Sequence, residues 1–138
     1  MAVLLLLSLA TPLQAASSGN PAGRYQAVTE TEYSITLTLD STGKARYEFV
    51  GWEADGSAPK QRKVLSGTWH HSGGLLSLQF PRGRFATYSI VPCLSYHEFG
   101  QPGCSAGLNL VHTNLADYYG LQRFGLWKSD SLSRNTNP

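Results

Sequence analysis

Short segments in which apolar and polar residues alternate run through most of the chain. Ile35, Leu37 and Leu39 alternate with serine and threonine, and Tyr47 and Phe49 alternate with charged residues. Successive side chains of a strand point to opposite faces, so this period of two predicts strands with one buried face. We expect about eight strands, over residues 24–30, 33–39, 44–52, 63–70, 75–80, 84–91, 106–112 and 121–128.

The segments between these strands are short and rich in turn-forming residues. The stretches "DSTGK" and "HSGGL" place glycine where a hairpin needs a positive φ, and "FPRGRF" joins two strands through proline and glycine. Hairpin-length connections predict an all-β antiparallel meander. Such a meander can close into a small lipocalin-like barrel, which removes its exposed edges. A two-sheet β-sandwich is the alternative, and residues 113–121 could add one helical turn capped by Asn114.

Composition limits the chain to one domain and a modest charge. The 138 residues are 41% hydrophobic, which is enough to build a core, and the formal net charge is only +2. That charge is too small to indicate a nucleic-acid partner, and we expect the basic run Lys60–Lys63 to be a solvated loop. We assign residues 17–23 to a linker, 24–128 to a β-barrel-like domain and 129–138 to a flexible tail.

The N-terminal segment has the pattern of an export signal. Residues 2–16 are uncharged and end in small residues, as in the hydrophobic and cleavage regions of a secretory signal peptide, although no basic residue precedes Ala2. The apolar run is shorter than the roughly 20 residues that span a membrane. We expect a signal peptide over 1–16, with cleavage after Ala15 or Ala16, and a periplasmic or secreted protein. No lipid-anchor cysteine follows the apolar run, and the mature chain should contain no transmembrane segment.

Two cysteines, Cys93 and Cys104, are the only pair in the chain. Outside the cytosol they should form a disulfide. Closing so short a loop is worth about 2–3 kcal/mol by the chain-entropy relation, so the bond could simply staple a small fold. A constrained loop also loses less entropy on association. The alternative hypothesis is therefore a partner-binding loop that presents Tyr96, His97, Glu98 and Phe99.

The adjacent histidines His70 and His71 raise the possibility of a metal site. Neighbouring residues on a strand point to opposite faces, so these two imidazoles do not readily bind one ion. Ligands would have to converge from His97, His112 and Glu98. The chain also lacks an H-E-x-x-H helix, a G-x-S-x-G elbow and a glycine-rich phosphate loop before a helix. We predict a protein that is not an enzyme and has no metal site and no cofactor.

The stretches "GRYQAV", "YSITLTLDSTGKARYEF" and "LSGTWHHSGGLLSLQF" resemble small lipocalin-like β-barrels of the bacterial envelope, of the NlpE N-terminal type. The resemblance covers about 60 residues and then fades. The C-x-x-C motif and the lipid-anchoring cysteine of that type are absent, so copper sensing and membrane anchoring do not carry over. The matching positions are Gly23 and Tyr25 in the opening, Leu37, Leu39 and Gly43 in one hairpin, and Gly67, Thr68, Trp69, Gly74, Leu76 and Leu78 in another.

The chain also resembles periplasmic lysozyme inhibitors of the membrane-bound C-type class, which are small disulfide-containing β-barrels. Ser41, Gly43 and Tyr47 in "DSTGKARYEF" are similar to the S-G-x-x-Y motif of that class, and "GLWKSD" is similar to its W-x-K stretch. Spacing and order differ from the class, so no inhibitory residue is carried over.

These patterns lead to two functional hypotheses. The first is an exported, non-enzymatic, monomeric module that binds a small apolar ligand or a cell-envelope component. The second is a periplasmic protein-binding inhibitor or immunity-type factor that acts through the Cys93–Cys104 loop. An apolar cavity would favour the first, and a filled core with a projecting loop would favour the second. The inner face, as ligand wall or as core, should carry Tyr47, Phe49, Trp69, Leu78 and Phe80.

Overall fold

A computed structural model describes residues 19–28, 33–53, 55–56, 60–97, 100–116 and 125–129. The expected signal peptide and the tail from residue 130 lie outside these residues. Within them, no helix has the length and apolar character needed to cross a membrane. The described strands are β1 (Gly23–Val28), β2 (Tyr33–Leu39), β3 (Lys44–Gly51), β4 (Gln61–Ser72), β5 (Leu75–Phe80), β6 (Arg84–Ser95), β7 (Cys104–Thr113) and β8 (Leu126–Lys128).

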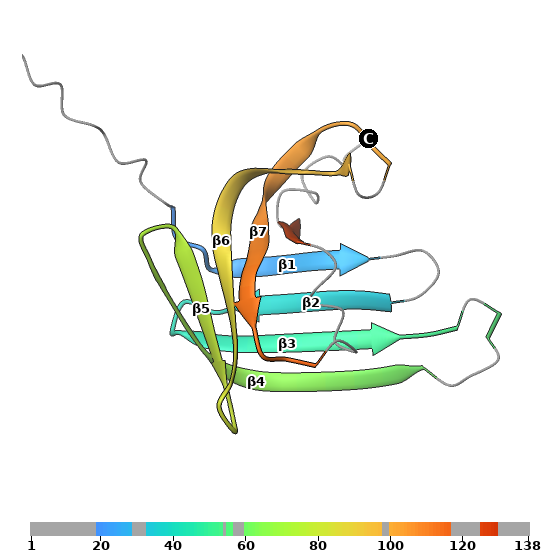
Figure 1. Cartoon of the computed structure of the whole chain (residues 1–138), viewed down its shortest axis with the longest axis horizontal. Coiled ribbons are helices and arrows are strands. Elements are labelled where there is room, and N and C mark those ends of the chain that lie inside the picture. The colour runs from blue at the N-terminus through green and yellow to red at the C-terminus, as the bar shows by residue number, and fades with distance from the viewer. Residues whose placement is uncertain are drawn as a thin grey trace, which may run out of the picture.

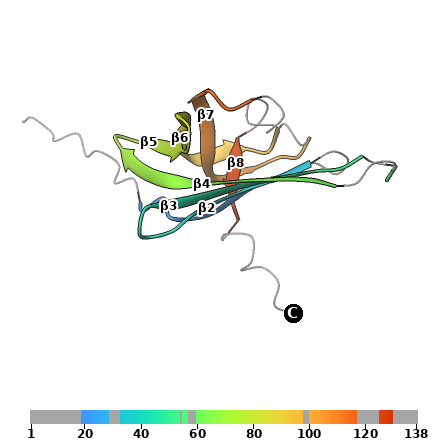
Figure 2. The ribbon, with the colours of Figure 1, turned by 90° about the horizontal axis from the view of Figure 1, so that it is seen from below.

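The strands form a closed antiparallel barrel. Each strand pairs with its neighbours in sequence, and β8 pairs with β1 to close the ring. The prediction of an all-β meander barrel is confirmed, and the sandwich alternative is wrong. In Figure 1, β1 to β4 form a gently curved layer that β5, β6 and β7 cross steeply. Figure 2 shows β5 to β7 above β2 to β4, so the barrel is flattened.

Strand β4 connects the two layers of the flattened barrel. Residues Gln61–Thr68 pair with β3, and Thr68–Ser72 pair with β5, so the strand exchanges partners at Thr68. A Cβ atom at Gly67 would overlap the carbonyl oxygen of Gln79 on β5. Glycine therefore permits the close approach of two backbones that the bend requires.

Side chains fill the centre of the barrel. The largest fully buried side chains, Tyr47 and Tyr88, are 0% exposed and come from β3 and β6. Of the predicted inner set, Phe49, Leu78 and Phe80 are also buried. The fifth member, Trp69, is half-buried and packs against this core, and its indole N–H donates to the Asp40 carbonyl at 2.9 Å.

Strand β6 extends four residues beyond the predicted end at Val91. Val91 pairs with Gly107 and Leu94 pairs with Ser105, so β6 carries one extra residue in a β-bulge. Pro92 lies in this bulge, where its missing N–H removes no regular ladder bond. Proline in the sequence predicts the end of a strand, but the bulge lets β6 continue to Ser95.

The bulge places a small apolar cluster on the outside of the barrel. Leu126 and Leu108 pair across β8 and β7 and are buried in the core, so the adjacent Trp127 points outward. Trp127 is nevertheless only 5% exposed, because its indole N–H donates to the Leu94 carbonyl at 3.0 Å and the Tyr96 ring centroid lies 6.1 Å away.

One local expectation differs from the structure, and another falls mostly outside the described residues. The basic run expected in a loop instead begins β4, and Arg62 donates to Glu48 Oε2 at 2.7 Å, alongside Arg46 at 2.8 Å. Residues 117–121 lie outside the described residues, so the helix-capping role of Asn114 stays a prediction. Its Oδ1 accepts from the Phe85 N–H at 2.8 Å, and its Nδ2 donates to the Gly83 carbonyl at 2.9 Å.

Candidate functional site

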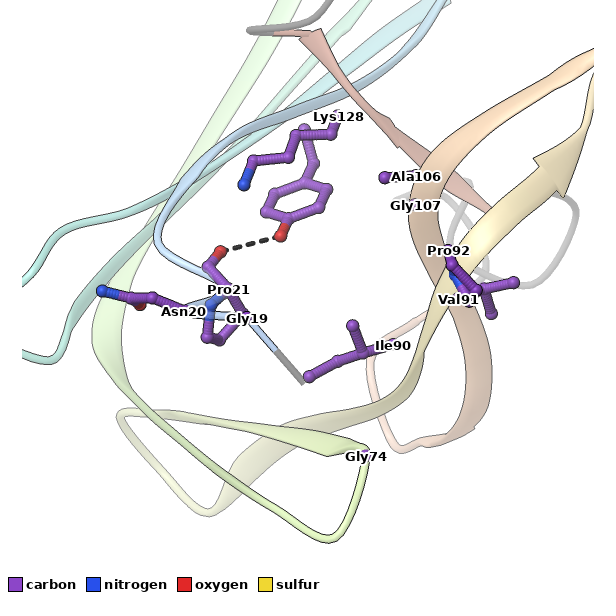
Figure 3. Close-up of a pocket in the computed structure, with 11 residues that line it drawn as sticks. Gly19, Asn20, Pro21, Gly74, Ile90, Val91, Pro92, Ala106, Gly107 and Lys128 are labelled. Atoms are coloured by element: carbon purple, nitrogen blue, oxygen red, sulfur yellow. Dashed lines mark hydrogen bonds between the residues drawn. The ribbon is translucent and has the colours of Figure 1, made fainter. Parts of the chain in front are cut away.

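A pocket of about 410 Å³, partly open to solvent, lies at one end of the barrel; we call it the mouth pocket. Its wall comes from the segment before β1, from the β4–β5 turn and from strands β1, β6, β7 and β8 (Figure 3). The lining residues are Gly19, Asn20, Pro21, Tyr25, Gly74, Ile90, Val91, Pro92, Ala106, Gly107 and Lys128.

The mouth pocket exists because inward-facing side chains become small at this end of the barrel. Tyr88 fills the interior one step deeper on the same face of β6 as Ile90. Near the mouth, β7 contributes only Ala106 and Gly107, and the β4–β5 turn contributes Gly74. The Ile90 N–H donates to the Gly74 carbonyl at 2.8 Å, which fixes the turn against β6.

One side of the pocket carries its polar groups. Tyr25 and Lys128 pair across β1 and β8, and the Lys128 ammonium lies 5.9 Å from the Tyr25 ring centroid. The Tyr25 hydroxyl donates to the Pro21 carbonyl at 2.7 Å, which holds the segment before β1 in place. Part of the expected linker 17–23 is thus ordered, with Pro21 buried and Gly23 already in β1.

The opposite side of the pocket is aliphatic. Figure 3 shows Lys128 and Pro21 on one side and Ile90, Val91 and Pro92 on the other. Of the described residues that line the pocket, Lys128 alone carries a charge at neutral pH, and none is acidic. The pocket therefore has an apolar wall opposite the side on which Tyr25 and Lys128 lie.

The inner-face residues predicted from the sequence do not line this pocket. Tyr47, Phe49, Leu78 and Phe80 are buried in the packed core, and Trp69 packs beside them. Sequence reasoning assigned none of the pocket residues to a site. The overlooked signal is the small residues of "CSAGL" opposite the bulge that contains Pro92.

The disulfide between Cys93 and Cys104 is present and joins β6 to β7, with Cα atoms 5.1 Å apart. Within the loop, Tyr96 is half-buried beside Trp127, and its N–H donates to the Gly103 carbonyl at 3.0 Å. His97 is exposed. Glu98 and Phe99 lie outside the described residues. Tyr96 therefore stabilises the outer cluster, and the partner-binding role of the loop stays a prediction.

The histidines occupy separate parts of the surface. His70 and His71 are exposed on β4, and the ring of His71 stacks beside Trp69 at 6.0 Å between centroids. This contact places Trp69 and His71 on one face of β4. His112 instead packs edge-on against Phe85 at 5.0 Å. In the described part of the chain, no three histidine, cysteine or acidic side chains gather closely enough to hold a metal ion.

Comparison with protein-family models, with curated proteins and with solved structures finds no match to this chain. The resemblances to envelope lipocalin-like barrels and to lysozyme inhibitors therefore stay predictions. The functional assignment rests on the geometry of the mouth pocket.

Proposed function

We propose that this protein is an exported, non-enzymatic module that binds a small, mainly apolar ligand in the mouth pocket. The observation that carries the proposal is the pocket of about 410 Å³ with an aliphatic wall and a few polar groups on one side. Small-molecule sites in proteins typically enclose about 300–1,000 Å³ and combine these two features.

The aliphatic wall is held before any ligand arrives. Pro92 lines the pocket, and the next residue, Cys93, is bonded covalently to Cys104 on β7. The disulfide therefore restricts the bulged part of β6 relative to the neighbouring strand. A wall fixed in advance loses little entropy when a ligand binds. On this proposal the disulfide serves both fold stability and the shape of the site.

The volume limits the size of the ligand. At a liquid-like volume of about 30 Å³ per non-hydrogen atom, the pocket holds roughly a dozen such atoms. A molecule the size of 1-octanol fits, whereas a complete two-chain lipid would have most of its body outside. Small ligands reach at most about 1.5 kcal/mol per atom and usually far less, so we expect a Kd for 1-octanol on the order of 0.1–1 mM.

Ligand-detected NMR with 1-octanol tests the proposal. Saturation transfer from the protein to 1-octanol should be seen for the wild type and lost when Ala106→Phe fills the pocket from β7. Ala116→Phe is the matched control, because Ala116 is exposed beyond the opposite end of β7. Asn20→Trp is a second substitution that should obstruct the pocket. Asn20 lines the pocket but is exposed, so the larger side chain should not disturb core packing. Equal transfer in all four proteins would overturn the proposal.

The inhibitor hypothesis is the alternative and makes a different prediction. A module that acts only through the Cys93–Cys104 loop should bind its protein partner equally well with the mouth pocket filled by Ala106→Phe. Of the four predicted contact residues, the structure describes Tyr96, which is half-buried, and His97, which is exposed and available to a partner. Failure of 1-octanol to bind the wild type would favour this alternative.

A further inference from the structure

Resting on the proposed function, we further propose that the oxidation state of Cys93 and Cys104 controls the affinity of the mouth pocket. The oxidised protein, with the disulfide formed, binds the apolar ligand. Reduction by a dithiol loosens the aliphatic wall and releases the ligand. The inference joins the place of the disulfide in the wall, the exposure of both cysteines and a second attachment of β6 that does not depend on the disulfide.

The disulfide holds a stretch of the wall that regular strand pairing does not. Within the described strands β6 and β7, the pairing omits Pro92 and Cys93, which together lie opposite Ala106 in the bulge. Pro92 and Ala106 line the pocket from the two strands (Figure 3), and proline has no N–H for a ladder bond. The covalent bond from Cys93 to Cys104 on β7 therefore fixes this stretch, with Cα atoms 5.1 Å apart.

The disulfide lies where a reductant can reach it. Cys93 and Cys104 are both exposed, and thiol–disulfide exchange requires a thiolate to attack one sulfur of the bond. The first thiolate of a dithiol forms a mixed disulfide with one cysteine and releases the other as a thiolate, which takes up a proton. The second thiol then displaces the remaining cysteine, which is also protonated.

The exchange leaves two protein thiols and the disulfide of the reductant, so the dithiol supplies both electrons and both protons. We expect the natural reductant to be the C-x-x-C dithiol of a thiol–disulfide oxidoreductase.

The barrel should stay folded after reduction, because β6 has a second attachment beyond the bulge. The Trp127 indole N–H donates to the Leu94 carbonyl at 3.0 Å. The Leu94 side chain also packs closely over β7, since a Cβ atom at Gly107 would lie 2.8 Å from Leu94 Cδ2. These contacts hold β6 against β7 and β8 without the disulfide. The loosening of the wall should therefore be local to Pro92 and Cys93.

The size of the effect follows from the wall that the ligand must then order. Fixing the backbone of one residue corresponds to about a five- to thirtyfold change in an equilibrium constant. The ring of Pro92 already restricts its own φ, so the cost is close to that of Cys93 alone. We expect reduction to raise the Kd of 1-octanol about tenfold.

The test is NMR titration of 1-octanol into the oxidised and the dithiothreitol-reduced protein at pH 7.5. Reduction should raise Kd about tenfold, and reoxidation should restore the original value. The double variant Cys93→Ser/Cys104→Ser should have the Kd of the reduced wild type and should not respond to dithiothreitol. Ile35→Ala is the matched control for lost stability, because Ile35 is buried and does not line the pocket. It should keep the affinity of the oxidised wild type.

The outcomes separate this inference from the proposed function. Failure of 1-octanol to bind the oxidised wild type would show that the ligand-binding function itself is wrong. Equal Kd values for the oxidised and reduced forms would leave that function standing and overturn the redox control. The amide spectrum of each titrated protein shows whether it is folded, and an unfolded reduced protein would overturn the redox control as well. So would a tenfold loss of affinity in Ile35→Ala, which would assign the effect to stability alone.

Discussion

Tyr88 allows a single-atom test of the packed barrel core. Its side chain is 0% exposed, and its hydroxyl has no hydrogen-bond partner among the residues that the structure describes. An unpaired buried hydroxyl costs about 1–3 kcal/mol of desolvation. Tyr88→Phe removes that hydroxyl and keeps the ring, so we expect the free energy of unfolding to rise by about 1–2 kcal/mol. Urea denaturation followed by tryptophan fluorescence measures this change.

Tyr25→Phe is the matched comparison, because the same atom is removed from another buried tyrosine. The Tyr25 hydroxyl donates to the Pro21 carbonyl at 2.7 Å. Its loss leaves that carbonyl without this bond and should lower the free energy of unfolding by about 1 kcal/mol. The two substitutions should therefore have opposite signs. Destabilisation by Tyr88→Phe equal to that by Tyr25→Phe would show that the Tyr88 hydroxyl is paired in solution, which would refute the reasoning.

Alkaline pH gives a second readout of the same burial. Burial raises the pKa of the Tyr88 hydroxyl well above its ordinary value of about 10. The folded state then holds this proton more tightly than the unfolded chain. The pH-dependent part of the free energy of unfolding that comes from Tyr88 is therefore fully present below pH 10 and decreases as the pH rises further. Between pH 10 and pH 11, wild type should lose about 1 kcal/mol more stability than Tyr88→Phe. Parallel losses in the two proteins would contradict a buried phenol.

Three further predictions concern the surface and the disulfide. Reduction of Cys93–Cys104, which are 11 residues apart, should lower the free energy of unfolding by about 3 kcal/mol in urea denaturation with and without reductant. In the same assay, Tyr96→Ala should lower the free energy of unfolding by about 1–2 kcal/mol, because the Tyr96 ring packs beside Trp127. His97→Ala should have no measurable effect, because His97 is exposed. The guanidinium groups that bond Glu48 lower the pKa of its carboxyl in the folded state. The contribution of this carboxylate to the free energy of unfolding is therefore complete above pH 4.5 and is lost as the pH falls through the lower pKa of the folded state. Glu48→Gln should therefore slightly lower the free energy of unfolding at pH 7. The difference between wild type and variant should disappear in acid and shrink in 1 M salt. An undiminished difference at pH 2 would exclude this ion-pair explanation.

Local patterns in the sequence predicted most of the barrel, because strand periodicity is a local property. Ile35, Leu37 and Leu39 alternate in the sequence and are buried in the structure. The ends of β6 and β7 were missed because Pro92 is an ordinary strand-breaking signal. Only the pairing of β6 with β7 shows that the extra residue of the bulge accommodates it.

The mouth pocket was not predicted, because its residues come from segments far apart in the chain. Asn20, Ile90, Ala106 and Lys128 become neighbours only when β8 pairs with β1 and β7. Sequence periodicity shows which side chains point inward, but not at which level of the barrel they leave space. The burial of Trp127 outside the barrel is also non-local, since it depends on Leu94 beyond the bulge.

The most direct test of the central claim is amide chemical-shift mapping of the isotope-labelled protein titrated with 1-octanol. The account predicts saturable shifts concentrated at Asn20, Ile90, Val91, Gly107 and Lys128, which surround the mouth pocket. Shifts centred on His97 and the disulfide loop, or no saturable shifts at millimolar 1-octanol, would contradict it.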